Sequence, residues 1–191
     1  EVLSFDVTDK IVGIEYREKA KTDEKGAPQG SDLSYMVAFP GLYELPVVNV
    51  GVGGSEFNHE MIIQLNPDII FYGVSDIRNV DDLQNKTRIP VITVYYNAIG
   101  TPKQDEMFYQ SLRVIGKALD KEVRAEELIN MIESYTRDLG NRTGSIPDEQ
   151  IKTAYIAGRA FFGSQGITGT DPQWPPFNWT NVRNVAHELS E

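Results

Sequence analysis

The 191-residue sequence contains no cysteine, and this absence excludes disulfides, zinc–thiolate sites and cysteine nucleophiles. It also has no apolar run near the roughly 20 residues that a membrane helix needs. Histidine is scarce too, with only His59 and His187. No H-x-x-x-H or H-E-x-x-H spacing and no Gly-x-Ser-x-Gly elbow occurs, so we expect no catalytic residue and no resident metal. His59 is better explained as a solvated or helix-cap residue.

Basic residues are outnumbered, with 18 Lys and Arg against 28 Asp and Glu, for a net charge of −10. This balance disfavours nucleic-acid binding, which depends on cations that neutralise phosphates. An acidic surface mainly keeps a protein soluble. The hydrophobic fraction of 40% indicates a globular chain with one good core or two small ones. The chain has no initiator Met and no signal peptide, as expected of a processed or trimmed chain.

The most informative stretch is residues 45–73, LPVVNVGVGGSEFNHEMIIQLNPDIIFYG. Two β-branched or aromatic apolar runs, residues 47–50 and 69–72, predict strands. Between them lie a glycine-rich turn and a run with helical periodicity. We therefore predict a strand–turn–helix–strand crossover whose two strands are parallel neighbours.

The glycine turn at residues 51–54 follows a strand and precedes a helix, which is where phosphate-binding loops occur. It matches neither G-x-G-x-x-G nor a P-loop, so the nucleotide hypothesis is weak. Two alternatives stay open: a tight turn that needs positive φ, or amides that help to bind an oxygen-rich ligand.

The other elements follow from periodicity and turn residues. Residues 105–139 predict two helices with a break near 119–121, and Thr101-Pro102 marks the start of the first. The remaining predictions are strands at 11–14, 89–96 and 151–157, short helices at 80–85 and 181–189, a loop at 17–33, a linker at 140–150 and an extended turn at 171–176.

Three groups of residues carry a family resemblance. The first is Gly53, Asn58, Glu60, Leu65, Pro67, Asp68, Ile69 and Ile70; the second runs from Leu112 to Ile129 around Gly116-Lys117; the third is Asn184-Val185-Ala186. In this order they resemble the substrate-binding proteins of ABC importers that have a rigid interlobe helix. Those proteins take up iron–siderophore complexes, haem, cobalamin and, in some members, molybdate or tungstate.

The resemblance implies an α/β fold of the class III periplasmic-binding-protein type. It places a parallel-sheet N-terminal lobe at residues 1–104, without the first strand of that lobe. Bridging helices follow at 105–140, and an incomplete second α/β lobe starts at 151–191.

The implied function is extracytoplasmic capture of an iron complex, siderophore-like, and its delivery to a membrane permease, with no cofactor. The chain would be periplasmic or extracellular and held at the cell surface by a lipid anchor outside this sequence. An oxyanion, haem or cobalamin ligand is the alternative within the family. In the family an acid at the position of Glu60 pairs with the permease; it is also a helix-start acid favoured by the macrodipole.

Ligands of open parallel sheets bind beyond the carboxyl ends of the strands. Tyr offers a hydroxyl on a rigid body, and Arg clamps anionic oxygens in pairs. Each candidate has the alternative of being a packing residue. The predicted ligand-binding residues are Tyr16, Arg17, Arg78, Tyr95, Tyr96, Arg159 and Trp174.

Two rival hypotheses come from other classes. Two-lobed enzymes of the nitrogenase type share such sheets, but they need cluster-ligating cysteines. A fragment that acts only in protein interaction, or as an intertwined dimer, is the second rival, because incomplete lobes leave unpaired strand edges.

Overall fold

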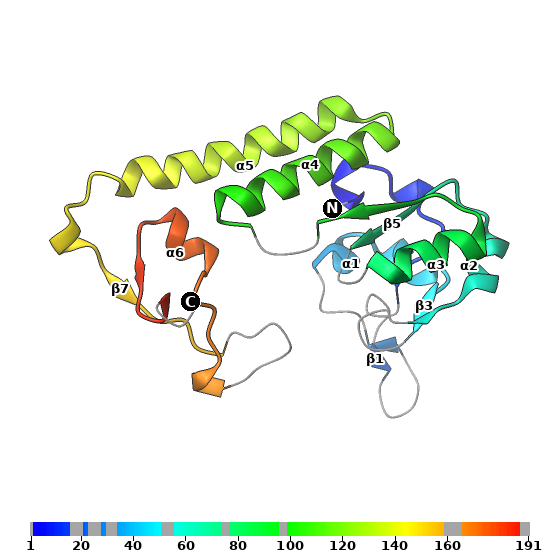
Figure 1. Cartoon of the computed structure of the whole chain (residues 1–191), viewed down its shortest axis with the longest axis horizontal. Coiled ribbons are helices and arrows are strands. Elements are labelled where there is room, and N and C mark those ends of the chain that lie inside the picture. Colours follow the sequence, from blue (N-terminus) through cyan, green and yellow to red (C-terminus); the bar gives the residue numbers. More distant parts are fainter. Residues whose placement is uncertain are drawn as a thin grey trace. The chain divides into compact units, whose positions relative to one another are not determined.

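The structure is a computed structural model that describes residues 2–15, 21–22, 28–29, 34–50, 56–73, 77–95, 99–158 and 166–187. The chain divides into two compact units, Glu1–Tyr95 and Tyr96–Glu191. Among the described residues, no helix is long and apolar enough to cross a membrane. Figure 1 shows the elements of both units along the chain.

The first unit combines short strands with short helices. Its helices are η1 (Val2–Phe5), η2 (Thr8–Lys10) and η4 (Pro40–Glu44), which are 3₁₀, and α1 (Ser34–Ala38), α2 (His59–Leu65) and α3 (Ile77–Thr87). Its strands are β1 (Lys21–Thr22), β2 (Pro28–Gln29), β3 (Asn49–Val50), β4 (Glu56–Phe57), β5 (Ile70–Gly73) and β6 (Val91–Val94).

A parallel crossover, β5–α3–β6, forms the centre of this unit. The two strands pair from Ile70 opposite Val91 to Gly73 opposite Val94. Helix α3 packs against them with Val80, Leu83 and Thr87, whose spacing of three and four places them on one face. The buried cluster consists of Ile62, Leu83 and Ile89, with Val48, Phe57, Ile70 and Val91 against it.

The prediction that residues 47–50 and 69–72 are parallel neighbours is wrong for the described residues. Val47 forms a parallel bridge with Ile14, and β3 pairs antiparallel with β4. The chain folds back as a hairpin before α2 begins, so β3 is paired within that hairpin. The parallel partner of β5 is β6, the next strand along the chain.

Other predictions for this unit are confirmed in part. The 80–85 helix exists and is longer, as α3, and the 89–96 strand is shorter, as β6. The predicted strand at 11–14 is reduced to the single bridge at Ile14. The predicted loop at 17–33 contains the small hairpin of β1 and β2, which pair antiparallel.

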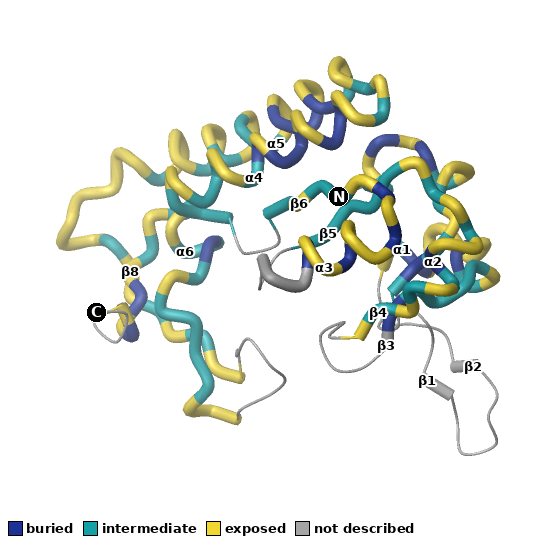
Figure 2. Tube along the Cα trace, turned by 45° about the vertical axis from the view of Figure 1, so that its right-hand side comes forward, coloured by how far each residue is buried: buried dark blue, intermediate teal, exposed yellow. Residues whose placement is uncertain are grey.

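The second unit is built on a helical hairpin, α4 (Pro102–Ala118) and α5 (Glu122–Thr143). Buried residues line the facing sides of the two helices and exposed residues the outer sides (Figure 2). The hairpin core contains Leu112, Ile115, Leu128 and Ile129. Both predicted helices and their break are confirmed, and Thr101 accepts a hydrogen bond from the Gln104 N–H as the predicted helix start requires.

After α5 the chain forms η6 (Asp148–Gln150), β7 (Thr153–Ala154), η7 (Gly166–Thr168), α6 (Pro175–Trp179) and β8 (Arg183–Asn184). The predicted strand at 151–157 is confirmed as the short β7.

Three predictions for this region need correction. The 140–150 linker is shorter, because α5 continues to Thr143. The 171–176 turn ends in α6, which begins at Pro175. The 181–189 helix is wrong, because Arg183–Asn184 form a strand parallel to β7. The Arg183 N–H donates to the Lys152 carbonyl at 2.9 Å, a long-range bond that local periodicity does not reveal.

Candidate functional site

One edge of the β5–β6 pair gathers two of the predicted ligand-binding positions. The strands are parallel and Gly73 lies opposite Val94, so both carboxyl ends meet at the same edge. Tyr95 follows β6 directly and is half-buried. Arg78 is the second residue of α3, which begins four residues after β5 ends. The backbone therefore brings Tyr95 and the first turn of α3 to one edge.

The chemistry of this edge suits an anionic, oxygen-rich ligand. The amino end of α3, an 11-residue helix, carries partial positive charge from its free N–H groups. A tyrosine hydroxyl donates or accepts a hydrogen bond, and an arginine guanidinium donates two parallel ones. The predicted residues Tyr16, Arg17, Tyr96 and Arg159 lie outside the described residues, as does the side chain of Arg78.

Trp174 lies in the second unit, at the residue that precedes α6, and is half-buried. The backbone N–H of Trp174 donates to the backbone carbonyl oxygen of Asp171 at 3.2 Å. The N–H of Phe177 donates back to the Trp174 carbonyl at 3.0 Å, which starts α6. Trp174 is thus fixed by its backbone at the end of a turn.

Helix α6 packs against the segment that leads into α4. Gly100 has φ +124°, a conformation that favours glycine, and a Cβ there would lie 2.8 Å from Pro175 Cβ. The Asn178 side chain donates to the Gly100 carbonyl at 3.3 Å, and the Gly100 N–H donates to Asp105 Oδ1 at 2.7 Å. Sequence reasoning missed Gly100 and Asn178; the Gly-Thr-Pro run before α4 was the available signal.

Glu60 is exposed in the first turn of α2. Asn58 caps this helix, because its Oδ1 accepts from the Met61 N–H at 3.0 Å. His59, the first residue of α2, is close to the predicted cap position. Its Nε2 lies 3.9 Å from Asp82 Oδ2 of α3, and Lys86 Nζ lies 2.7 Å from the same oxygen.

In the described part of the chain, no group of three or more His, Asp or Glu side chains is placed to hold a metal ion. His187 is exposed.

Clear pKa shifts fall on the α4–α5 hairpin. A hydrogen bond from Arg113 lowers the pKa of Glu126, and the same bond raises the pKa of Arg113. Burial, with Asp105 and Glu133 adding negative charge, raises the pKa of the Tyr109 phenol. These groups lie on α4 and α5, and none of them is a predicted ligand-binding residue.

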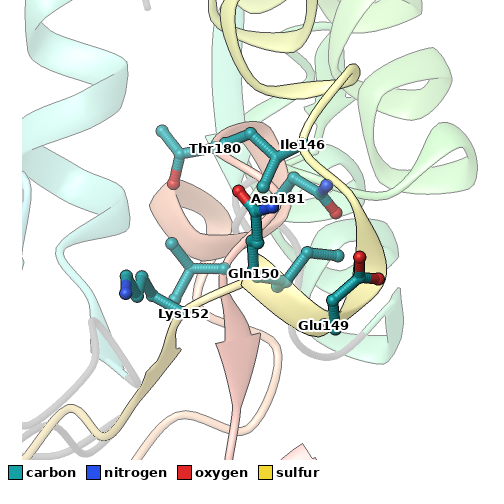
Figure 3. A pocket seen from close by; sticks show the side chains of 8 residues that line it. Ile146, Glu149, Gln150, Lys152, Thr180 and Asn181 are labelled. Carbon is teal, nitrogen blue, oxygen red and sulfur yellow. The ribbon is translucent and has the colours of Figure 1, made fainter.

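Each unit has a surface hollow formed by described residues. One, of about 430 Å³, is lined in the second unit by residues 146, 149–152 and 180–182 (Figure 3). Another, of about 370 Å³, is lined in the first unit by residues 8–9, 38–42 and 45. Neither contains a predicted ligand-binding residue, and most of the side chains that line the first are exposed. Both hollows are open to solvent, whereas ligand pockets are enclosed and bury most of the ligand's surface.

Comparison with known proteins supplies the family. A family model described as periplasmic binding protein matches residues 2–189. No curated protein sequence matches the chain with significant similarity.

Among solved structures, a periplasmic solute-binding protein from Veillonella parvula aligns with TM-score 0.66 and 19% identity, over 97% of this chain and 51% of that one. A molybdate periplasmic binding protein of Haemophilus influenzae, bound to molybdate, aligns with TM-score 0.59 and 17% identity. The alignment covers 80% of this chain and 48% of that one. A periplasmic haem-binding protein from Pseudomonas aeruginosa aligns with TM-score 0.58 and 18% identity. The alignment covers 96% of this chain and 57% of that one.

The chain thus spans about half the length of these solved structures. The likeness supports the mixed α/β fold with parallel strands that β5 and β6 show. Because the family model matches nearly the whole sequence, this chain belongs to the periplasmic binding protein family.

Proposed function

We propose that the chain is the solute-binding part of an ABC importer and captures an iron complex of the siderophore type outside the cytoplasm. The observation that supports this proposal is the parallel β5–β6 pair, whose carboxyl ends lie at one edge, with Tyr95 directly after β6 and α3 beginning four residues after β5. Family membership supports the class of function, and the edge supports an anionic ligand.

The ligand would be held by hydrogen bonds and stacking, with no bond made or broken and no cofactor. Arg78 would donate to negatively charged oxygens of the chelate, and the Tyr95 hydroxyl would add one hydrogen bond. Tyr16, Arg17, Tyr96 and Arg159 would complete the polar contacts. Trp174 would supply a flat apolar face.

Glu60 would dock the chain to the permease. Its exposure in the first turn of α2 supports this role, since an ion pair with a partner requires an accessible carboxylate. A lipid anchor outside this sequence would hold the protein at the membrane surface.

Other ligands of the family are the second candidate. Solved relatives whose names specify molybdate or haem favour these two ligands over cobalamin. Molybdate would need only the polar groups at the sheet edge, whereas haem would also use an aromatic face.

The test is a titration of the purified chain with a ferric tris-catecholate chelate, haemin, cobalamin and sodium molybdate, followed by tryptophan fluorescence. We expect saturable quenching by the ferric chelate. Arg78→Gln should weaken binding about tenfold or more, because charge-assisted hydrogen bonds contribute about 1.5–3 kcal/mol. The matched control is Arg137→Gln, at an exposed position of α5, which should bind normally.

Binding of none of the four ligands would refute the proposal. Sedimentation equilibrium then decides between the remaining hypotheses. A stable dimer would favour the interaction domain or the intertwined dimer, and a monomer would refute the dimer.

A further inference from the structure

The turn at residues 171–174, which we call the Trp174 turn, is closed by two internal hydrogen bonds. The Gln173 N–H donates to Asp171 Oδ1 at 3.1 Å, and the Trp174 N–H donates to the Asp171 carbonyl at 3.2 Å. Such bonds fix the shape of a turn, but they do not fix its place on the rest of the unit.

Asn184 supplies that attachment. Its Nδ2 donates to the carbonyl oxygens of Asp171 and Pro172, both at 3.0 Å. Its Oδ1 accepts from the Ala186 N–H at 3.0 Å. The residue is only 9% exposed. A side-chain amide has two N–H donors and one oxygen acceptor, so both donors and the acceptor are used.

The backbone of Asn184 is itself held in place. It lies in β8, where the Arg183 N–H donates to Lys152 at 2.9 Å and the Val185 N–H to Ala154 at 3.0 Å. The carbonyl oxygen of Asp171 accepts from both the Asn184 amide and the Trp174 N–H. A single oxygen atom therefore joins the paired strands to the backbone of Trp174.

We propose that Asn184 is a positioning residue that pre-orients Trp174 for a ligand with a flat aromatic part, such as a catecholate chelate or a porphyrin. This inference rests on the proposed function, in which Trp174 stacks on the ligand. An indole that is already held in place loses little conformational entropy when the ligand binds. The affinity is higher because this entropic cost is avoided. A tetrahedral oxyanion would have no use for this face.

The informative substitution is Asn184→Asp. It keeps an acceptor for the Ala186 N–H but places a carboxylate oxygen against two carbonyl oxygens. Asn184→Ser removes the same donors without adding charge. The matched control is Asn130→Asp, the same change at an exposed position of α5. All variants carry Trp179→Phe and 5-fluorotryptophan, so Trp174 is the sole fluorine-labelled residue.

Without ligand, we expect one sharp fluorine resonance in the parent and in Asn130→Asp. Both Asn184 variants should show broadened or split resonances and greater quenching by acrylamide. Fluorine spectra equal to the control in a folded Asn184 variant would overturn the proposal.

A measurement on the unaltered chain covers the case in which neither variant folds. The Trp174 and Ala186 amides should then exchange hydrogen with similar protection, because Asn184 connects the two. A protected Ala186 amide beside an unprotected Trp174 amide would overturn the proposal as well.

The binding arm uses haemin and the ferric tris-catecholate chelate. The affinity of the Asn184 variants for these two ligands should fall about tenfold, because ordering one free side chain on binding costs about that much. Their affinity for sodium molybdate should be unaffected. Unchanged affinity despite an altered fluorine spectrum would refute the role in binding. If the parent binds neither probe, the proposed function fails, and the fluorine data still show whether Asn184 positions Trp174.

Discussion

Gly116 shows how one residue sets the geometry of the second unit. It lies on the face of α4 that meets α5, where a Cβ would lie 2.8 Å from Ala125 Cβ and 3.1 Å from the Lys121 carbonyl. Both neighbours belong to or adjoin the backbone, so neither can turn away as a long side chain does. A hydrogen in place of a side chain is what allows the two helices to approach this closely.

Substituting Gly116→Val should therefore lower the free energy of unfolding by about 1–3 kcal/mol, the usual cost of overpacking. Urea unfolding followed by circular dichroism measures it. Gly140→Val is the matched control, because nothing lies within 4 Å of a Cβ there. The control should stay within about 0.5 kcal/mol of the parent. Equal losses in both variants would contradict the close approach of the helices at Gly116 as the cause.

At the scale of elements, α2 depends on its cap. The helix has only seven residues, His59–Leu65. It contains few internal hydrogen bonds, so the capping interactions at its ends contribute a large share of its stability. Asn58 satisfies the Met61 N–H at the start, and Asn66 ends the helix in a left-handed conformation with φ +46°. The same helix presents Glu60.

Asn58→Ala should destabilise the first unit by about 1 kcal/mol, because the capping acceptor is lost. Asn58→Asp keeps an acceptor and adds a charge favoured by the helix dipole, so it should be neutral or slightly stabilising. Thermal unfolding at pH 7 compares the two. A loss in the Asp variant as large as in the Ala variant would contradict the capping role.

The α4–α5 hairpin carries an ion pair between its helices. Arg113 Nε lies 2.7 Å from Glu126 Oε1, and Nη2 lies 3.3 Å from Oε2. The hydrogen bond from Arg113 lowers the pKa of the Glu126 carboxyl below its usual value of 4.5. A carboxyl whose folded pKa is lowered stabilises the fold above the unfolded pKa, and it loses that effect as the pH falls through the folded pKa.

Carbon-detected NMR titration of Glu126 should thus give a pKa below 4.5 in the parent. Arg113→Gln should return it toward the usual value, and the pH dependence of stability on the acid side should become shallower. Arg124→Gln is the control, since Arg124 pairs with Glu127 instead. An unchanged Glu126 pKa in Arg113→Gln would show that the pair does not persist in solution.

At the scale of the whole molecule, the net charge of −10 means that like charges repel one another at neutral pH, which destabilises the folded state. Salt screens such repulsion. Raising NaCl at pH 7 should therefore raise the midpoint of thermal unfolding by about 2–4 °C, the shift that about 1 kcal/mol produces in a chain of this size. Near pH 4.7, the isoelectric point of the sequence, this effect should vanish. A salt effect of equal size at both pH values would contradict an origin in net charge.

Local patterns predicted the elements whose residues specify their own conformation. The apolar spacing of α4 and α5, the Thr101 start and the break near Asp120 follow from helix periodicity and capping, and the structure confirms them. The motif from Asn58 to Ile70 indicated the family, and the family model agrees. Of the site, the sequence placed Tyr95 at the end of a strand and Arg78 near the start of a helix, because strand ends are local features.

Only the tertiary structure decided which strands pair. The hairpin of β3 and β4, the β5–β6 pair and the strand at Arg183–Asn184 depend on partners up to about thirty residues away in the chain, and periodicity carries no information on partners. The same holds for Asn184, whose three hydrogen bonds arise because β8 pairs with β7. A side-chain amide satisfies its donors and acceptor only where the folded backbone brings three peptide groups within reach.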